Sequence, residues 1–268
     1  MKKNILIIIP IIILSIILLG CNNILTDSYQ YDDTNYKIGN MAFTEQISEI
    51  NIDWIVGDVI ITKSETQEII IREDVDANID DSLKMHYNLS NGILDVKFCG
   101  NNESINHSYR VKKLYVYLPS MLKKITLNNK TADIIISNVI ITDLSINNIS
   151  GDIDMQKSEI DLLNINNTSG SILLFYNLLN YVNINTISGN VGISCDYGPL
   201  GLNVTSESAG ITIYIKENEM VSFNYETEIG TFKTNLEYTT NNNTYIFNNG
   251  ITVHNVKTQT GYFKVLKK

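Results

Sequence analysis

The feature that most constrains this chain is a twelve-residue unit that recurs at a nearly fixed interval. The unit reads LSINNISGDIDM from Leu144, LNINNTSGSILL from Leu163 and VNINTISGNVGI from Val182, so that these copies begin 19 residues apart. Five further segments align with it without gaps, and they begin at Ile50, Ile125, Leu202, Phe223 and His254. Such a repeat is typical of structures that stack equivalent units upon one another.

Within each copy, apolar residues alternate with polar ones. The first, third, tenth and twelfth positions give 32 sites in the eight copies, and 30 of them are apolar, with Thr234 and His254 as the exceptions. Because the side chains of a β-strand point alternately to its two faces, each copy predicts two short strands with one buried face. A small residue at the eighth position, such as Gly151, Gly170 or Gly189, predicts a turn between the two strands.

The spacing of these eighth positions predicts the fold class. From Ala132 to Gly230 they follow one another at intervals of 19, 19, 19, 20 and 21 residues. Nothing in a meander of hairpins requires the same side chains at the same places, whereas like residues in a coil lie about 4.8 Å above one another. We therefore expect an all-β fold, a parallel β-helix or closely related β-solenoid, with about 19–21 residues per rung.

The fifth position predicts a ladder of side-chain amides inside this coil. It reads Asn129, Asn148 and Asn167 in three consecutive copies, followed by Thr186 and Ser206. By alternation this position points inward beside the turn, where stacked amides can hydrogen-bond to one another along the axis. We interpret these asparagines as structural and not as catalytic residues.

Two segments interrupt the repeat and predict caps on the coil. Residues 66–119 contain the hairpin signal Asn91-Gly92 between strand-like runs, and Pro119 ends the last run. They predict a small antiparallel cap at the N-terminal end. Residues 236–250, with an Asn-rich tip, predict a second hairpin. Caps matter because the open end of a solenoid is an unpaired edge that invites aggregation.

The N-terminus predicts export and a lipid anchor. Two lysines precede an apolar run from Asn4 to Leu19. Residues 18–21 read LLGC and end at Cys21. A charged start followed by such a run is typical of a secretory signal, and the last four residues resemble the bacterial lipobox. This resemblance implies transfer of diacylglycerol to the Cys21 thiol and cleavage after Gly20. The alternative is an uncleaved membrane anchor with an incidental cysteine, although the run is short for a spanning helix.

We accordingly divide the chain into a lipoprotein signal peptide (1–20), a polar tether (21–45) and a β-helical domain (46–268). The acylated Cys21 would bind membrane lipid and hold the domain outside the cytoplasm, on the cell membrane or on an outer membrane. The formal net charge of −9 argues against nucleic acid as a partner, because a phosphate-binding surface needs Lys and Arg. The remaining Cys99 and Cys195 either form one disulfide or stay as buried thiols.

Few residues suggest a reaction centre. The three histidines show no metal-binding spacing, and no nucleophile elbow surrounds the serines of the Ser-Gly pairs. We interpret these serines as turn residues that bond to their own backbone. Asp133 and Asp152 occupy the ninth position of adjacent copies, where they form a solvated face or a weak calcium site. We predict no catalytic residue, no metal site and no cofactor.

The order of the motifs resembles a known family. VGDVII, LYVYLPSMLKKITLNN and the serial SGDI, SGSI and SGNV together are similar to the bacterial putative-adhesin family over about residues 45–265. The resemblance implies a β-helical domain of unknown function, related to the heads of autotransporter-like surface proteins. Ala132 and Ala209 depart from the glycine that is usual at the turn.

We therefore expect a non-enzymatic, lipid-anchored surface protein that serves in adhesion or in binding and scaffolding of the envelope. Its ligand would be a surface, a glycan or an envelope protein. An accessory or regulatory protein of an envelope-stress system is the alternative, and a glycan-active β-helix enzyme is a third. Such an enzyme needs clustered acids in a cleft and often a basic residue, whereas the two arginines, Arg72 and Arg110, lie outside the regular units.

Overall fold

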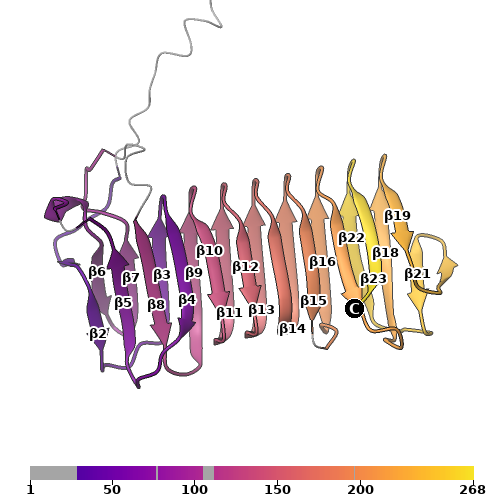
Figure 1. Ribbon diagram of the computed structural model, residues 1–268, viewed down its shortest axis with the longest axis horizontal. Helices are drawn as coiled ribbons and strands as arrows, with labels where there is room; N and C mark the ends of the chain where they lie inside the picture. Colours follow the sequence, from indigo (N-terminus) through magenta and orange to yellow (C-terminus); the bar gives the residue numbers. More distant parts are fainter. Residues whose placement is uncertain (1–28, 77, 105–111, 196) are drawn as a thin grey trace, which may run out of the picture.

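The computed structural model describes residues 29–76, 78–104, 112–195 and 197–268. These residues form β-strands, turns and a single 3-10 helix at Asp81–Leu83. The strands lie across an elongated body and follow one another along its longest axis (Figure 1). The expected all-β solenoid is confirmed. In the described ranges, no helix has the length and apolar character needed to cross a membrane.

The strands form two sheets, and each rung gives one strand to each sheet. The first sheet contains the strands that open the units, the rung strand β7 and the cap strands β1, β6, β20 and β21. Its members are β1 (Lys37–Ile38), β3 (Glu49–Trp54), β6 (His86–Ser90), β7 (Ile93–Lys97), β9 (Leu122–Asn129), β11 (Ile140–Asn148), β13 (Glu159–Asn167), β16 (Gly201–Ser206), β18 (Val221–Thr227), β20 (Thr239–Asn241), β21 (Thr244–Phe247) and β22 (Val253–Thr258). The second sheet contains β2 (Met41–Phe43), β4 (Asp58–Lys63), β5 (Ile69–Asp74), β8 (Lys113–Leu118), β10 (Asp133–Ser137), β12 (Ile153–Gln156), β15 (Val191–Cys195), β17 (Ile211–Ile215), β19 (Thr231–Thr234) and β23 (Tyr262–Lys267). The long strand β14 (Ile172–Thr186) passes from the second sheet into the first and joins them.

Equivalent residues of successive units lie beside one another in parallel register. Ile146 pairs with Ile165, and Ile165 pairs with Ile184. All three side chains are buried. Full burial of such a side chain stabilises a fold by about 1.5–3 kcal/mol, so a column of them explains why the chain repeats itself at a fixed period.

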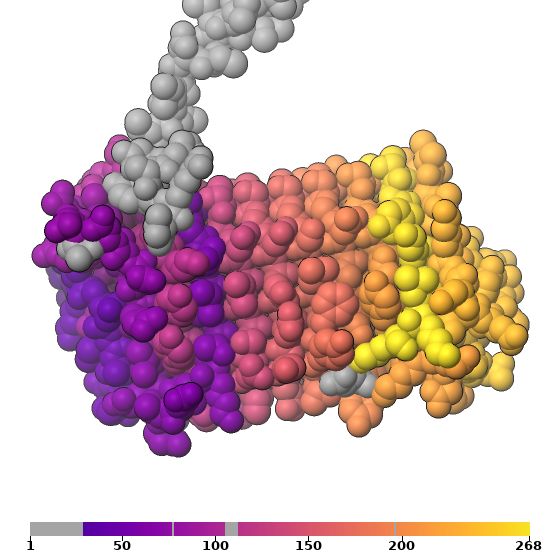
Figure 2. Space-filling model, in the orientation of Figure 1, coloured from indigo at the N-terminus to yellow at the C-terminus, as the bar shows by residue number. Residues whose placement is uncertain are grey.

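The rungs do not stack in the order of the sequence. The last unit, β22 and β23, lies between the rung of β16 and β17 and the rung of β18 and β19. Figure 1 shows these yellow strands enclosed by orange ones, and Figure 2 shows the same band at the surface. At the other end, β3 and β4 lie between the rung of β7 and β8 and the rung of β9 and β10. Each long insertion lets the chain pass to the end of the stack and return.

Antiparallel strands close both ends of the solenoid. At the N-terminal end, β5 pairs antiparallel with β8 and β2, while β6 pairs antiparallel with β7 and β1. The predicted antiparallel cap is present, but the segment assigned to it also supplies β7 and β8, which form a parallel rung. This corrects the expectation for residues 66–119. At the other end, β21 pairs antiparallel with β18, and β20 with β21, so residues 236–250 contribute a second cap.

The chain from Tyr29 onward is part of the folded body and not of a tether. The Tyr29 hydroxyl donates to the carbonyl of Asp53 at 3.1 Å, and the Tyr31 hydroxyl donates to the carbonyl of Cys99 at 2.9 Å. Strands β1 and β2 then join the cap. The segment predicted as a tether at 21–45 is therefore folded from Tyr29 onward. The signal peptide 1–20 and Cys21 lie outside the described residues.

A buried ion pair ties the N-terminal cap to the first rungs. Lys112 Nζ lies 2.5 Å from Glu73 Oε1, and both side chains are buried. Glu73 also accepts a hydrogen bond from the backbone of Met85, and Lys112 donates to the carbonyl of Leu83. Burial lowers the pKa of Lys112, and the neighbouring carboxylate opposes that shift. Cys99 lies in this region and Cys195 lies in β15; both are buried, and no disulfide joins them.

Candidate functional site

A groove runs along the body where the first sheet turns toward the second. It has a volume of about 790 Å³ and extends from β3 to β22. Six strand pairings separate these two strands. At about 4.8 Å per pairing the groove is roughly 29 Å long. We call it the axial groove; its two walls and its floor come from the fourth, sixth and fifth positions of the units.

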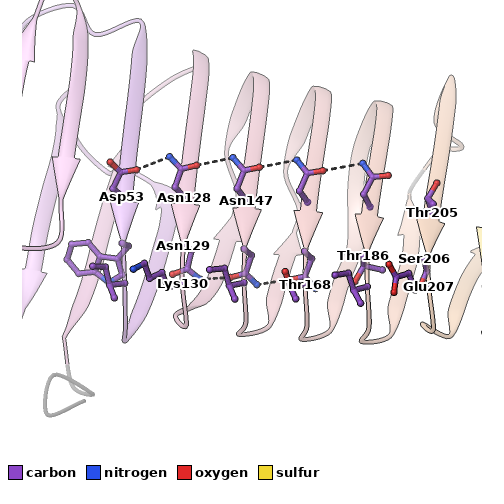
Figure 3. A pocket seen from close by; sticks show the side chains of 18 of the residues that line it. Asp53, Asn128, Asn129, Lys130, Asn147, Thr168, Thr186, Thr205, Ser206 and Glu207 are labelled. Atoms are coloured by element: carbon purple, nitrogen blue, oxygen red, sulfur yellow. Dashed lines mark hydrogen bonds between the residues drawn. The ribbon is translucent and has the colours of Figure 1, made fainter. Parts of the chain in front are cut away.

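The first wall is a row of side-chain amides at the fourth position. Asn147 donates to Asn128, Asn166 to Asn147 and Asn185 to Asn166, over distances of 2.9, 3.0 and 3.2 Å. Asn128 donates in turn to Asp53 Oδ1 at 2.8 Å (Figure 3). Each amide has two N–H groups and an oxygen with two lone pairs. The first three amides therefore each use one donor and one acceptor within the row, and Asn185 uses one donor. The remaining donors and lone pairs are not used by the row.

The second wall consists of side chains at the sixth position. In its middle stand Ile149 and Ile187, which are 54% and 46% exposed, with Thr168 between them. Lys130 and Glu207 occupy the same position toward the two ends of the groove (Figure 3). The middle of this wall is therefore aliphatic and partly open to solvent.

The floor contains the asparagines that alternation predicted to point inward. Asn129, Asn148 and Asn167 lie in one row, and each of the first two donates to the next amide, at 2.6 and 2.8 Å. All three also donate to a turn carbonyl of their own rung. Thr186 and Ser206 continue this row and bond to the backbone of their own turns. The polar side chains of the floor thus form hydrogen bonds within the protein. We expect the floor to support the walls and not to bind a ligand.

The turns beneath the groove bring neighbouring rungs very close together. Gly170 has φ +101°, and a Cβ at this residue would lie 2.2 Å from the carbonyl oxygen of Gly151. Gly151 and Gly189 share this conformation, with φ of +104° and +101°. Ala132, which begins this series of turns, is not among the residues with a positive φ. Its backbone therefore accepts a side chain where the glycines do not.

The serines of the Ser-Gly pairs act differently from the expectation. Ser169 Oγ lies 3.3 Å from the carbonyl oxygen of Ile149, and Ser188 Oγ lies 3.3 Å from that of Thr168. Each hydroxyl donates to the carbonyl of the preceding rung and not to its own turn. The prediction that they bond their own backbone was wrong, because sequence spacing does not reveal how closely the next rung approaches.

The charged groups that line the groove lie toward its ends, and the outermost two, Asp53 and Lys257, form ion pairs. Asp53 forms an ion pair with Lys97 at one end, and Lys257 Nζ lies 3.6 Å from Glu226 Oε2 at the other. Tyr29 lines the groove beside Asp53. Burial raises the pKa of Tyr29, and the charge of Asp53 adds to that shift. Lys130 and Glu207 stand between these two pairs. The rungs between Lys130 and Glu207, from Asn147 to Ile187, are lined by amides, hydroxyls and aliphatic groups.

The carboxylates of the protein are not placed for acid–base chemistry in this groove. Of the residues that the structure describes, Asp53 and Glu207 are the carboxylates that line it, and five strand pairings, or about 24 Å, separate their rungs. The paired carboxyl groups of glycosidases lie about 5–9.5 Å apart. Asp133 and Asp152 accept hydrogen bonds from the backbone N–H groups of Asp152 and Ser171. Among the residues described, no three of the types His, Cys, Asp and Glu cluster closely enough to hold a metal ion.

The groove was not predicted from the sequence. Its signal was present in the fourth position, where Asn128, Asn147, Asn166 and Asn185 recur in four successive rungs. The polar second position forms another amide row on the same sheet, in which Asn183 donates to Asn164 at 3.0 Å. That row does not line the groove. The two asparagine rows cannot be told apart in the sequence, because the geometry of the turn determines which of them lines the groove.

The stacked parallel rungs, the glycine turns and the capped ends define the class of protein as a repetitive β-solenoid of the two-sheet type. Within this class, the chain belongs to the Toastrack DUF4097 family, whose match covers residues 54–265. The match extends over nearly all the units on which the family resemblance was based, and it confirms that resemblance. No curated protein matches the chain.

The chain is also similar to several solved structures. A putative lipid binding protein from Parabacteroides distasonis has 13% identity and a TM-score of 0.49, with 88% of this chain and 98% of that chain covered. A putative adhesin from Bacteroides fragilis has 11% identity and a TM-score of 0.43, with 87% and 97% covered. A putative cell adhesion protein from Clostridium sporogenes has 11% identity and a TM-score of 0.36, with 87% and 100% covered. Likenesses at this level do not extend to function.

Proposed function

We propose that this protein is a lipid-anchored, extracytoplasmic surface-binding protein without enzymatic activity, and that the axial groove is its binding face. The observation that carries the proposal is the groove itself. It is long, open and lined by regularly repeated neutral groups, so it suits an extended ligand better than a small substrate. The ligand would belong to another surface or to the envelope of the same cell.

The anchoring part of the proposal is supported by the N-terminal sequence. An apolar run that ends in LLGC at Cys21 provides the thiol that acylation requires. Tyr29, the first described residue, lies at the groove's Asp53 end. A short connection from Cys21 to Tyr29 would therefore hold the rod near the membrane by one end of its length.

The non-enzymatic part of the proposal is supported by the composition of the groove. Amides and aliphatic side chains neither accept nor release protons at neutral pH. The two lining carboxylates, Asp53 and Glu207, lie too far apart to act on one bond. Binding without turnover is the activity that remains for such a surface.

The anchor is tested by replacing Cys21 with serine in the full chain and following the protein with labelled palmitate. We expect the label to be lost, and the protein either to leave the membrane fraction or to remain as an uncleaved precursor. Continued labelling of the Cys21→Ser variant would refute the lipid anchor at this residue.

The binding face is tested on cells that display the full chain, with attachment to immobilised envelope material and host matrix as the readout. The double variant Asn147→Ala/Asn166→Ala should reduce attachment at least tenfold. The matched control Asn164→Ala/Asn183→Ala removes the same groups from the row outside the groove and should attach like the wild type. Equal attachment by all three proteins would contradict the assignment of the groove.

A further inference from the structure

We propose that the axial groove binds an extended, uncharged polysaccharide whose sugars are joined through equatorial bonds, with about one sugar at each rung. This inference rests on the proposed function, because it names the ligand class of the same groove. Three properties of the walls carry it: their period, their polarity and their charge.

The period of the groove fits a sugar chain better than a peptide. Equivalent side chains recur about every 4.8 Å, which is close to the length that one equatorially linked hexose adds to a chain. An extended peptide advances by about 3.3 Å per residue, so its side chains would fall out of step with the rungs. A peptide bound by strand addition also needs unpaired backbone groups. The backbone N–H groups of Ile149 and Thr168 already donate to the preceding rung, at 3.2 and 3.0 Å.

The polarity of the two walls fits the two kinds of surface on a sugar ring. Asn147 and Asn166 each keep one N–H and one lone pair outside their row, and a hydroxyl both donates and accepts. Ile149 and Ile187 face the groove as exposed aliphatic groups, which suit the C–H face of a pyranose. A lipid acyl chain would cover these aliphatic groups equally well, but it would also remove the amides from water without giving them partners.

The charge of the groove fits an uncharged chain. From the rung of Asn147 to that of Asn185 neither wall carries an ionised group, and Lys130 and Glu207 lie one rung before and one rung after this section. The nearest charges in the amide row, Asp53 and Lys257, are engaged in ion pairs. A polyanion would gain no cationic partners along this middle section and would be repelled by a protein of net charge −9. A polycation would likewise meet neutral amides in place of carboxylates. The walls therefore favour a polymer that offers hydroxyl groups or neutral amides.

The proposal is tested by calorimetric titration of the detergent-solubilised full chain with oligosaccharides of increasing length. The probes are β-1,4-linked oligomers of glucose and of N-acetylglucosamine, from two to eight sugars. For at least one series, we expect the affinity to rise at least tenfold from two to six sugars and then to level off, because the groove spans six rung steps. Maltohexaose has the composition of the glucose hexamer but axial linkages that coil it, and it should bind at least tenfold more weakly.

Variants then place the binding in the groove. Asn147→Ala/Asn166→Ala should weaken hexamer binding at least tenfold, whereas Asn164→Ala/Asn183→Ala should leave it unchanged. An affinity independent of chain length, equal binding of maltohexaose, or binding by neither series would overturn the proposal. If neither series binds while Asn147→Ala/Asn166→Ala still abolishes attachment of cells, the ligand class is wrong and the groove remains the binding face. If that variant attaches normally, the proposed function itself fails.

Discussion

At the scale of single residues, the repeated asparagines are hydrogen-bonded to the equivalent asparagines of neighbouring rungs. Asn148 shows this most fully, because its amide nitrogen donates to Asn167 and to the carbonyl of Gly151, at 2.8 Å in both cases, while its oxygen accepts from Asn129 at 2.6 Å. A buried amide left without partners costs roughly 1–3 kcal/mol per group. The identical residue one rung away removes that cost, and this explains why the chain repeats asparagine and not merely a polar residue.

The turn glycines give a prediction that separates backbone strain from steric clash. Gly170→Ala would force a side chain into φ +101° and place its Cβ 2.2 Å from the carbonyl oxygen of Gly151. Left-handed conformations cost about 1–2 kcal/mol for residues with a Cβ, and overpacking adds about 1–3 kcal/mol. We expect the free energy of unfolding, measured by urea denaturation, to fall by about 2–5 kcal/mol.

The matched control is Gly39→Ala, because Gly39 has φ +91° but no atom within 4 Å of the point where a Cβ would lie. The free energy of unfolding of this variant should fall only by the cost of the left-handed conformation, about 1–2 kcal/mol. An equal loss in Gly39→Ala and Gly170→Ala would show that the close approach of the rungs does not contribute.

Residue roles were predictable from the sequence where alternation alone decides them. The inward direction of Asn129, Asn148 and Asn167 follows from parity within a strand, and the structure places these residues in one row. The roles of Ser169 and Asn147 depend instead on which group of the next rung lies within reach. The sequence of one repeat does not reveal distances between rungs. The hydrogen bonds of the serines and the groove wall were therefore not predicted.

At the scale of the elements, the positions of the rungs in the stack differ from their positions in the chain. The spacing of 31 residues between the units at Phe223 and His254 shows that a long segment intervenes. It does not show whether the last unit lies at the end of the stack or inside it. The units themselves were predictable because alternation repeats in each of them. Their order was not, because the units at Leu202, Phe223 and His254 all have mainly apolar inward faces and could pair in either order.

The last unit, which lies between two others in the stack, places a histidine in the column of apolar residues at the first position. His254 is buried, pairs in register with Phe223 and lines a small cavity with Leu202. Its Nδ1 has no hydrogen-bond partner among the described residues. Burial lowers the pKa of His254 from 6.5 to about 4. The folded state therefore holds this imidazole neutral at pH values where the unfolded chain protonates it.

The histidine predicts a loss of stability in mild acid. Between pH 6.5 and pH 4 the unfolded state binds more protons than the folded state, so the free energy of unfolding falls as the pH is lowered through this window. At pH 4.5 the loss from this residue amounts to about 2–3 kcal/mol. His254→Leu should remove it. We expect urea denaturation at pH 7 and pH 4.5 to show a smaller acid loss in the variant by about that amount, and an identical loss in both proteins would contradict the burial of a neutral imidazole.

At the scale of the whole molecule, the stacked rungs form a rod with both ends capped (Figure 1), and the axial groove runs along it with an uncharged middle section (Figure 3). The rod and its rung length were predictable because a column of like side chains needs a fixed period. The groove was not, because it arises where the first sheet turns toward the second. Its walls combine Asn147 with Ile149 and Asn185 with Ile187, and the two members of each pair lie two residues apart in their unit.

The most direct test of the groove as the binding face is a nuclear magnetic resonance titration that follows the side-chain amides of asparagine. The detergent-solubilised full chain is titrated with the β-1,4-linked hexamer that binds most tightly. We predict shifts in the amide signals of the groove wall, from Asn128, Asn147, Asn166 and Asn185. The signals of Asn164 and Asn183 should stay unchanged, since their row lies outside the groove. Shifts confined to Asn164 and Asn183, or no shift in either row, would contradict the assignment.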